Sequence, residues 1–198
     1  MAAGPARRLG AGALGQEDEV RAFFGLPLPE THRAALEPFI GTCAAAAPDF
    51  RWTPAANLHL TIRFLGHVAM SLAEGVAERV ELSRPRGFEV RLGGAGVFKR
   101  GRMARVVWLG VAEGSRELAE VAGLVEAECV KAGLEPEGRR FSAHLTLARA
   151  RSREGAPPPS LPPVPDLPPW RAAGLILYRS RLGRGGSVYE PLRTVSLG

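Results

Sequence analysis

The sequence has no long hydrophobic run. Although 45% of its 198 residues are hydrophobic, no stretch approaches the roughly 18 consecutive apolar residues that a membrane-spanning helix needs. Near the N-terminus, Arg7 and Arg8 are followed by scattered glycines and then by the acidic run 17–19, unlike the continuous apolar core of a secretory signal. We therefore expect a flexible N-terminal extension over 1–19, a single bilobal domain over 20–198, a cytoplasmic protein and no membrane partner.

Cysteine and histidine are also scarce, with two and four residues respectively. Cys43 and Cys129 each lie in an alanine-rich stretch typical of a helix, and neither has a CxxC neighbour. The count permits one disulfide, but a reducing compartment favours two buried free thiols. The four histidines show no metal-ligand spacing. We expect no metal and no cofactor.

Acidic residues are outnumbered by basic ones. The formal net charge is +6, and the isoelectric point is near 10.3. Such a balance fits a polyanionic partner, although an arginine-rich composition by itself also makes a basic surface. Charge alone is a weak signal.

One short pattern, His-Leu-Thr followed by an aliphatic residue, occurs twice in the chain. The first copy contains His59 and Thr61, and the second contains His144 and Thr146. In both copies the histidine and threonine alternate with apolar residues. This period of two is typical of a half-buried strand, whose successive side chains point to opposite faces. Each copy therefore predicts a histidine and a threonine side by side on the face away from the core.

The rest of the chain predicts a repeated order of strands and helices. We expect strands at 20–26, 57–65, 88–92, 104–111, 142–149, 172–178 and 187–195, and helices at 29–47, 71–82 and 115–132, the last capped by Ser115. A turn or bulge is expected at 93–96, a hairpin turn at 183–186, and a proline-rich surface loop at 153–169. The order indicates an α+β protein of duplicated β-α-β units, with two antiparallel sheets facing a central cleft.

Two histidines on facing strands suit displacement at phosphorus. Histidine titrates near pH 6.5, so one can take a proton from the attacking water while the other supplies one to the departing alkoxide. Threonine hydroxyls two positions further on can donate to the non-bridging phosphate oxygens. This chemistry suits a cyclic phosphodiester, whose ring strain helps the leaving group.

With these motifs the sequence resembles the two-histidine (2H) phosphoesterases. Within them it is similar to the bacterial and archaeal RNA 2′,3′-cyclic phosphodiesterases, also called 2′-5′ RNA ligase or LigT-like proteins. The resemblance is carried by the stretches 21–30, 51–66, 96–98, 104–110 and 177–182. The family usually has proline before the second histidine, where this chain has Ala143.

The resemblance implies roles for individual residues. His59 would be the general acid that protonates the leaving 3′ oxygen, and His144 the general base that activates water; the sequence alone does not assign these roles, and they exchange in the ligating direction. Thr61 and Thr146 would hold the phosphate. Arg149 matches a family arginine near the phosphate, but strand parity places it on the core face, so it needs a bulge or the strand end to reach the site.

Two further candidates have alternative interpretations. Arg63 has the parity of the histidine face and is expected either to bind substrate or to pair with an acidic neighbour. Phe23 would either stack on the terminal base or pack in the core. His32, expected at the surface, and His67 have no partner motif, so both are interpreted as structural.

The predicted function is hydrolysis of a terminal RNA 2′,3′-cyclic phosphate to a 2′-phosphomonoester by a monomeric, metal-independent enzyme, with tRNA fragments among the candidate substrates. One alternative is a 2′-5′ RNA ligase that joins tRNA halves at the same site. Another is a basic RNA-binding module without catalysis, whose salt-dependent affinity would not need His59 or His144.

Overall fold

A computed structural model describes residues 18–183 and 186–198. Most of the predicted extension, residues 1–17, and the tip of the predicted turn, residues 184–185, lie outside the described residues. No helix in the described ranges is long and apolar enough to cross a membrane. The elements, in chain order, are β1 (Glu19–Pro27), α1 (Glu30–Ala46), β2 (Phe50–Trp52), a 3-10 turn (Ala55–Asn57), β3 (His59–Ala69), α2 (Met70–Leu82), β4 (Phe88–Arg100), β5 (Met103–Glu113), α3 (Ser115–Lys131), β6 (His144–Ala150), β7 (Trp170–Ala172), β8 (Gly174–Gly183) and β9 (Gly186–Ser196).

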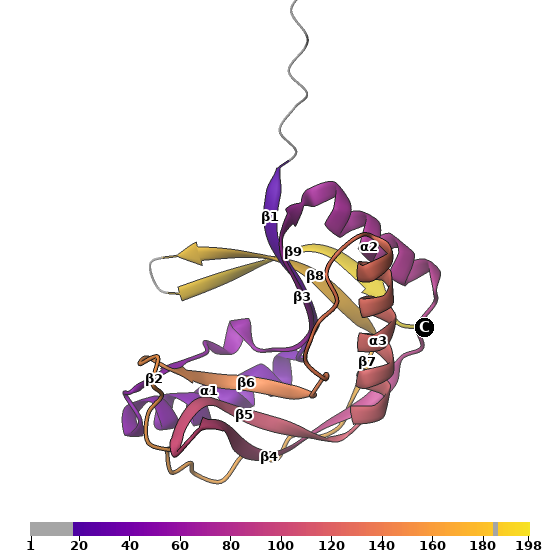
Figure 1. The fold of residues 1–198 in the computed structure, drawn as a ribbon. Coiled ribbons are helices and arrows are strands. Elements are labelled where there is room, and N and C mark those ends of the chain that lie inside the picture. Colours follow the sequence, from indigo (N-terminus) through magenta and orange to yellow (C-terminus); the bar gives the residue numbers. More distant parts are fainter. Residues whose placement is uncertain (1–17, 184–185) are drawn as a thin grey trace, which may run out of the picture.

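The strands form two similar halves that meet at the motif strands. Their order is β7-β4-β5-β6-β3-β1-β8-β9, with β2 added beside β6, and every pairing is antiparallel. In the described residues β3 and β6 share one ladder pair, Leu60 with Leu145. From this junction β3-β1-β8 and β6-β5-β4 extend in opposite directions (Figure 1). This is the predicted α+β architecture with an internal duplication.

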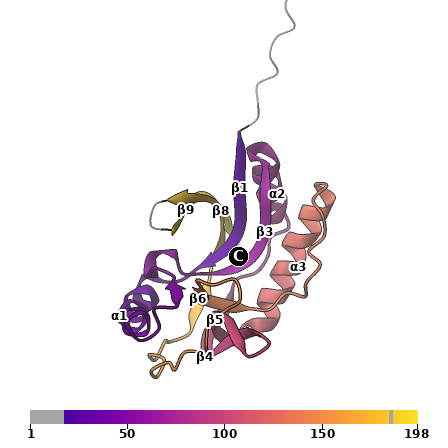
Figure 2. The same cartoon turned by 60° about the vertical axis from the view of Figure 1, so that its left-hand side comes forward.

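The helices cover the core side of these strands. α3 packs on β3, and α2 packs on β1, β3, β8 and β9; the two helices lie side by side in both views (Figures 1 and 2) and are joined by the ion pair of Arg79 with Glu128. α1 packs against β2. Buried apolar side chains, mostly leucine, valine and phenylalanine, fill the space between the helices and the strands, so the histidines lie on the opposite face.

Several local predictions needed correction. β3 continues through Gly66, the predicted end, because a glycine tolerates the left-handed φ of +79° found there. The stretch 93–96 is confirmed as the bulge of the predicted turn or bulge: β4 continues through it, with a register shift between Leu92 and Ala95. Ser115 does not cap α3: the cap is Gly114 at φ +88°, and the Ser115 hydroxyl donates to the carbonyl of Val111.

The two cysteines and His32 are all buried, which was predicted for the cysteines but not for the histidine. Cys43 and Cys129 are free and buried, which confirms the predicted thiols, and burial raises the pKa of Cys129 to about 11. His32 is buried, not at the surface, with 2% of its area exposed. Its Nε2 lies 2.8 Å from the carbonyl oxygen of Pro168, and its ring packs on Trp170, so it ties α1 to β7.

Candidate active site

His59 begins β3 and is held by its own chain. Its Nδ1 donates to the carbonyl oxygen of Asn57 at 2.8 Å. A carbonyl can only accept, so Nδ1 carries the proton and the neutral ring has its free lone pair on Nε2. The Thr61 hydroxyl lies 3.1 Å from this Nε2. His59 is therefore fixed in one tautomer, with the nitrogen that can take part in proton transfer beside Thr61.

His144 has the same arrangement at the start of β6. Its Nδ1 donates to the carbonyl oxygen of Ser142, also two residues earlier and also at 2.8 Å. Thr146 follows on the same face, and both side chains are half-buried while Leu145 between them is fully buried. The structure thus places His59, Thr61, His144 and Thr146 on the noncore face of adjacent strands, as the alternation predicts.

A β-bulge follows the threonine in both copies. In β6, Val107 pairs with Ala148 and Trp108 with Thr146, so Leu147 is the extra residue. In β3, Phe24 pairs with Arg63 and Gly25 with Thr61, so Ile62 is the extra residue. A bulge reverses the alternation beyond it.

In β6 this reversal turns Arg149 to the histidine face. Leu147 and Ala148 are both buried, and Arg149 is exposed. Its charge contributes to lowering the pKa of both His59 and His144, which requires that the guanidinium lie near both rings. The bulge that the sequence argument required for Arg149 is present.

In β3 the same reversal removes Arg63 from the histidine face, contrary to strand parity. Its guanidinium bonds to the Glu126 carboxylate on α3 and donates to the carbonyl oxygen of Glu135. Arg63 therefore fastens α3 to the sheet, and the interpretation as a substrate-binding residue is wrong. Phe64, 45% exposed, takes the place that Arg149 has in β6.

Phe23 lies on the histidine face but offers no free ring surface. It is 1% exposed, because it packs against His59 at 4.8 Å, Tyr178 at 5.1 Å and Tyr189 at 5.0 Å between ring centroids. The expectation that Phe23 stacks on a base is therefore wrong. Phe23 instead packs against the His59 ring. The Tyr189 ring also packs against His59, with 5.1 Å between the ring centroids.

The surroundings of His144 differ. Phe98 of β4 meets the imidazole edge-on at 4.9 Å and packs on Trp108 at 5.3 Å. Phe98, Tyr178 and Tyr189 were not among the predicted site residues, since they come from strands remote from the motifs. The alternation of buried Leu175 and Leu177 with Tyr178 was the available signal for one of them.

Both histidines are poor proton acceptors in the free protein. Burial, together with the positive charge of Arg149, lowers the pKa of His59 to about 4, while the bond to the Asn57 carbonyl opposes the shift. The pKa of His144 is lowered for the same reasons, with Ser142 opposing. At neutral pH both rings are therefore uncharged, with Nε2 unprotonated.

Comparison with known proteins identifies the family. The sequence model of the family described as LigT like Phosphoesterase matches residues 26–108 and again residues 109–189. Each match contains one His-x-Thr strand. The chain belongs to this family.

Curated relatives of this LigT-like chain have one name in common. The Escherichia coli RNA 2′,3′-cyclic phosphodiesterase is 31% identical over 89% of this chain and 96% of the relative. The enzyme of that name from Methanothermobacter thermautotrophicus is 34% identical over 67% of this chain and 72% of its own length. The Aeropyrum pernix enzyme of that name is 38% identical over 51% of this chain and 57% of its own length, so the match spans little more than half of that relative.

Solved structures agree on the fold. Escherichia coli LigT complexed with 3′-AMP superposes with a TM-score of 0.77 at 29% identity, covering 91% of this chain and 99% of that one. A Thermus thermophilus protein gives a TM-score of 0.70 at 28% identity, covering 89% and 97%. The fold is therefore the LigT-like fold that the sequence resemblance implied.

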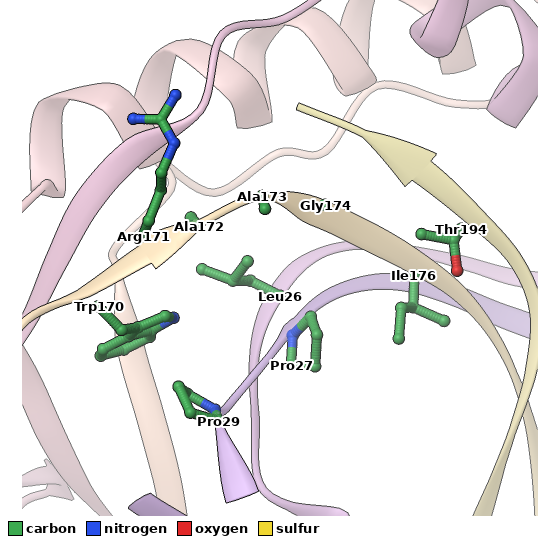
Figure 3. Close-up of a pocket in the computed structure, with 10 residues that line it drawn as sticks. All are labelled: Leu26, Pro27, Pro29, Trp170, Arg171, Ala172, Ala173, Gly174, Ile176 and Thr194. Atoms are coloured by element: carbon green, nitrogen blue, oxygen red, sulfur yellow. The ribbon is translucent and has the colours of Figure 1, made fainter. Parts of the chain in front are cut away.

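An apolar pocket of about 350 Å³ is lined mainly by residues of β1, β7 and β8 (Figure 3). Pro27, Pro29, Trp170 and Ile176 surround it. Pro27 is the ladder partner of His59, so the pocket borders the histidine face of the first half. Its size is at the lower end of the range for small-molecule sites.

Proposed function

We propose that this chain hydrolyses the 2′,3′-cyclic phosphate at the end of an RNA to a 2′-phosphomonoester, using two histidines and no metal. The observation that carries the proposal is the matched geometry of the histidines. Each has Nδ1 tied to a backbone carbonyl two residues earlier and a threonine two residues later. The common name of the curated relatives supports the substrate.

In the proposed reaction one proton is removed on one side of phosphorus and a second proton is delivered on the other side. His144 Nε2 takes a proton from water, whose oxygen attacks the phosphorus. The bond from phosphorus to O3′ breaks, and His59 Nε2 gives its proton to the departing O3′. The product has a 2′-phosphate and a free 3′ hydroxyl, and solvent restores the two protonation states. Thr61, Thr146 and Arg149 would hold the non-bridging oxygens, where negative charge develops.

The lowered pKa of His59 constrains this scheme. A general acid must be protonated, but with a pKa of about 4 the ring is neutral in the free protein at pH 7. An anionic phosphate beside the ring favours its charged form and offsets the charge of Arg149. The substrate therefore brings His59 to the protonation state that the reaction requires.

The pocket next to His59 suits the base of the terminal nucleotide. The departing O3′ belongs to the terminal ribose, so that nucleoside lies on the side of the general acid. Phe23 is buried and cannot stack on the base, whereas Trp170, Pro27 and Ile176 line an open apolar hollow. We assign base contact to this pocket.

The test is a short RNA ending in 2′,3′-cyclic phosphate, incubated in EDTA with the wild type and with His59→Ala and His144→Ala. We expect a 2′-phosphate end from the wild type, and each variant to be slower by about 10²- to 10⁴-fold, the usual contribution of one general acid or base.

Other results of this experiment would point to a different function or mechanism. Binding without turnover by the wild type would favour a non-catalytic RNA-binding module. A requirement for added metal would contradict the two-histidine mechanism. Adding an RNA with a 5′ hydroxyl tests the ligase alternative, because a 5′ oxygen would then take the place of water. Net joining instead of hydrolysis would favour that reading.

A further inference from the structure

A row of side chains crosses the second half of the sheet beyond the catalytic pair. Arg51 of β2 is the ladder partner of Arg149 of β6. Arg149 is also the partner of Val106 of β5, and Val106 of Phe98 of β4. Directly paired residues share one face of a sheet. We call these four residues the Arg51 row.

The two arginines of this row are set against each other. Both are exposed, and within the described ranges neither forms an ion pair with an acidic side chain, while ten other arginines or lysines do. Like charges directly opposite in a ladder are destabilising. An anion between the two guanidinium groups would remove this repulsion, and a phosphate matches their geometry.

The reacting phosphate does not account for the whole row. The row crosses β6 three residues beyond Thr146, which at about 3.3 Å per residue places it within about 10 Å of that threonine along the strand. Arg149 can reach back toward the two histidines, whose pKa values it affects. Arg51 lies on the neighbouring strand, and neither histidine pKa includes an effect of its charge.

The opposite end of the row provides an aromatic surface. Phe98 is 38% exposed, although it also packs on Trp108 and His144. Cationic side chains beside exposed aromatic rings are how proteins bind single-stranded nucleic acid, with phosphates on the former and bases stacked on the latter.

We propose that the Arg51 row binds the nucleotide next to the reacting one, with its phosphate between Arg51 and Arg149 and its base on Phe98. The inference rests on the proposed function and narrows it: the substrate is an oligonucleotide, and a cyclic mononucleotide is a poor one.

The experiment compares two substrates that share the reacting group, adenosine 2′,3′-cyclic monophosphate and a short oligoadenylate ending in the same cyclic phosphate. The measured quantity is the ratio of kcat/KM for the oligomer to kcat/KM for the monomer. We expect this ratio to be well above one for the wild type and to fall about tenfold in Arg51→Ala, the usual effect of losing one charge-assisted hydrogen bond. Phe98→Leu should also lower it, and Phe98→Tyr should keep it.

Arg86→Ala is the matched control, because Arg86 is another exposed arginine without an ion pair in the described residues and lies before the opposite end of β4. It should leave the ratio unchanged. A ratio near one in the wild type, or an equal fall in Arg51→Ala and Arg86→Ala, would overturn the inference while leaving the proposed function standing.

Binding provides a readout that does not depend on turnover. The affinity of an oligoadenylate with a 3′ hydroxyl end is measured over a series of salt concentrations. Loss of one phosphate contact should reduce the slope of log K against log salt by about 0.7 in Arg51→Ala and not in Arg86→Ala. Equal slopes for Arg51→Ala and wild type would overturn the inference even if the wild type hydrolysed neither substrate.

Discussion

Around His59 the rings of Phe23, Tyr178 and Tyr189 lie within 6.0 Å, and Asn57 donates its side-chain amide to the carbonyl of Ser187 on β9 at 2.7 Å. Around His144, Phe98 is the neighbouring ring described, and Ser142 contributes its backbone carbonyl. Both imidazoles bond through Nδ1 to the carbonyl two residues earlier, but His59 has the more enclosed surroundings. A duplicated strand can therefore keep one hydrogen-bond pattern while its surroundings set different proton affinities. In the free protein His59, the proposed acid, has a pKa of about 4, so the bound phosphate must raise this pKa before His59 can donate a proton.

The difference between the surroundings of His59 and His144 should have its largest effect on the pH dependence of stability. The pKa of His59 is about 4 in the folded state, against the ordinary 6.5, so the unfolded chain binds the proton more tightly. The stabilisation is complete above pH 6.5 and is lost as the pH falls to 4, by about 3 kcal/mol.

Urea denaturation at a series of pH values would measure this contribution. Other groups also titrate in this range, so the relevant quantity is the difference between wild type and His59→Gln. His144→Gln should flatten the curve less. An equal effect of the two substitutions would mean that the two environments do not differ.

The charge of Arg149 lowers the pKa of both histidines, one in each half, so its removal should affect both. Both histidine pKa values lie below 6.5 in the free protein, so kcat/KM, with His59 protonated and His144 neutral, should peak below pH 6.5. Arg149→Met should lower kcat/KM about a hundredfold by removing a phosphate donor. It should also move the optimum to higher pH, because both pKa values then rise. A fall in activity with the optimum unchanged would assign Arg149 to binding alone.

Two glycines, one in each half, should differ in their tolerance of a methyl group. A Cβ at Gly96 would lie 2.3 Å from the Trp108 ring, whereas one at Gly25 would lie 3.2 Å from His59 and 3.3 Å from Tyr178. Gly96→Ala should lower the free energy of unfolding by about 2 kcal/mol, and Gly25→Ala by less. Thermal or urea denaturation would check this order, and the reverse order would contradict the packing described for the second half.

Asn57 and Ser142 form a matched pair for a smaller effect. Both accept the imidazole proton through backbone carbonyls, which substitution retains, but Asn57 also holds β9 through its side chain. Asn57→Ala should lower kcat about tenfold, the cost of one hydrogen bond, with little change in KM, and should shift the pH profile. Ser142→Ala should behave like wild type. Equal kinetics for the two variants would remove any role for the amide.

Local patterns were sufficient to predict the positions of the four motif side chains. Alternation placed His59, Thr61, His144 and Thr146 on one face, because strand periodicity is set by backbone geometry. The same rule failed for Arg63, since the bulge at Ile62 reverses the alternation just beyond the motif. Nothing in the chain's apolar pattern distinguishes an extra residue in one strand from ordinary continuation.

Contacts between remote segments were beyond prediction for a different reason. Phe23 could be read as exposed or buried until β8 and β9 were placed beside it, since its 1% exposure results from Tyr178 and Tyr189. The buried state of His32 likewise depends on Pro168 and Trp170, far along the chain. Burial of such residues is a property of the tertiary arrangement.

The junction of the two halves has a mechanical consequence. In the described part of the chain β3 and β6 are joined by one ladder pair, Leu60 with Leu145, and both side chains are buried. With so few shared backbone hydrogen bonds, the angle between the two sheets is set by side-chain volume at the joint and by α3 on β3. The distance between the two imidazoles therefore depends on buried side chains. Adding or removing one methylene at Leu60 or Leu145 would change this distance without altering any group that contacts the substrate.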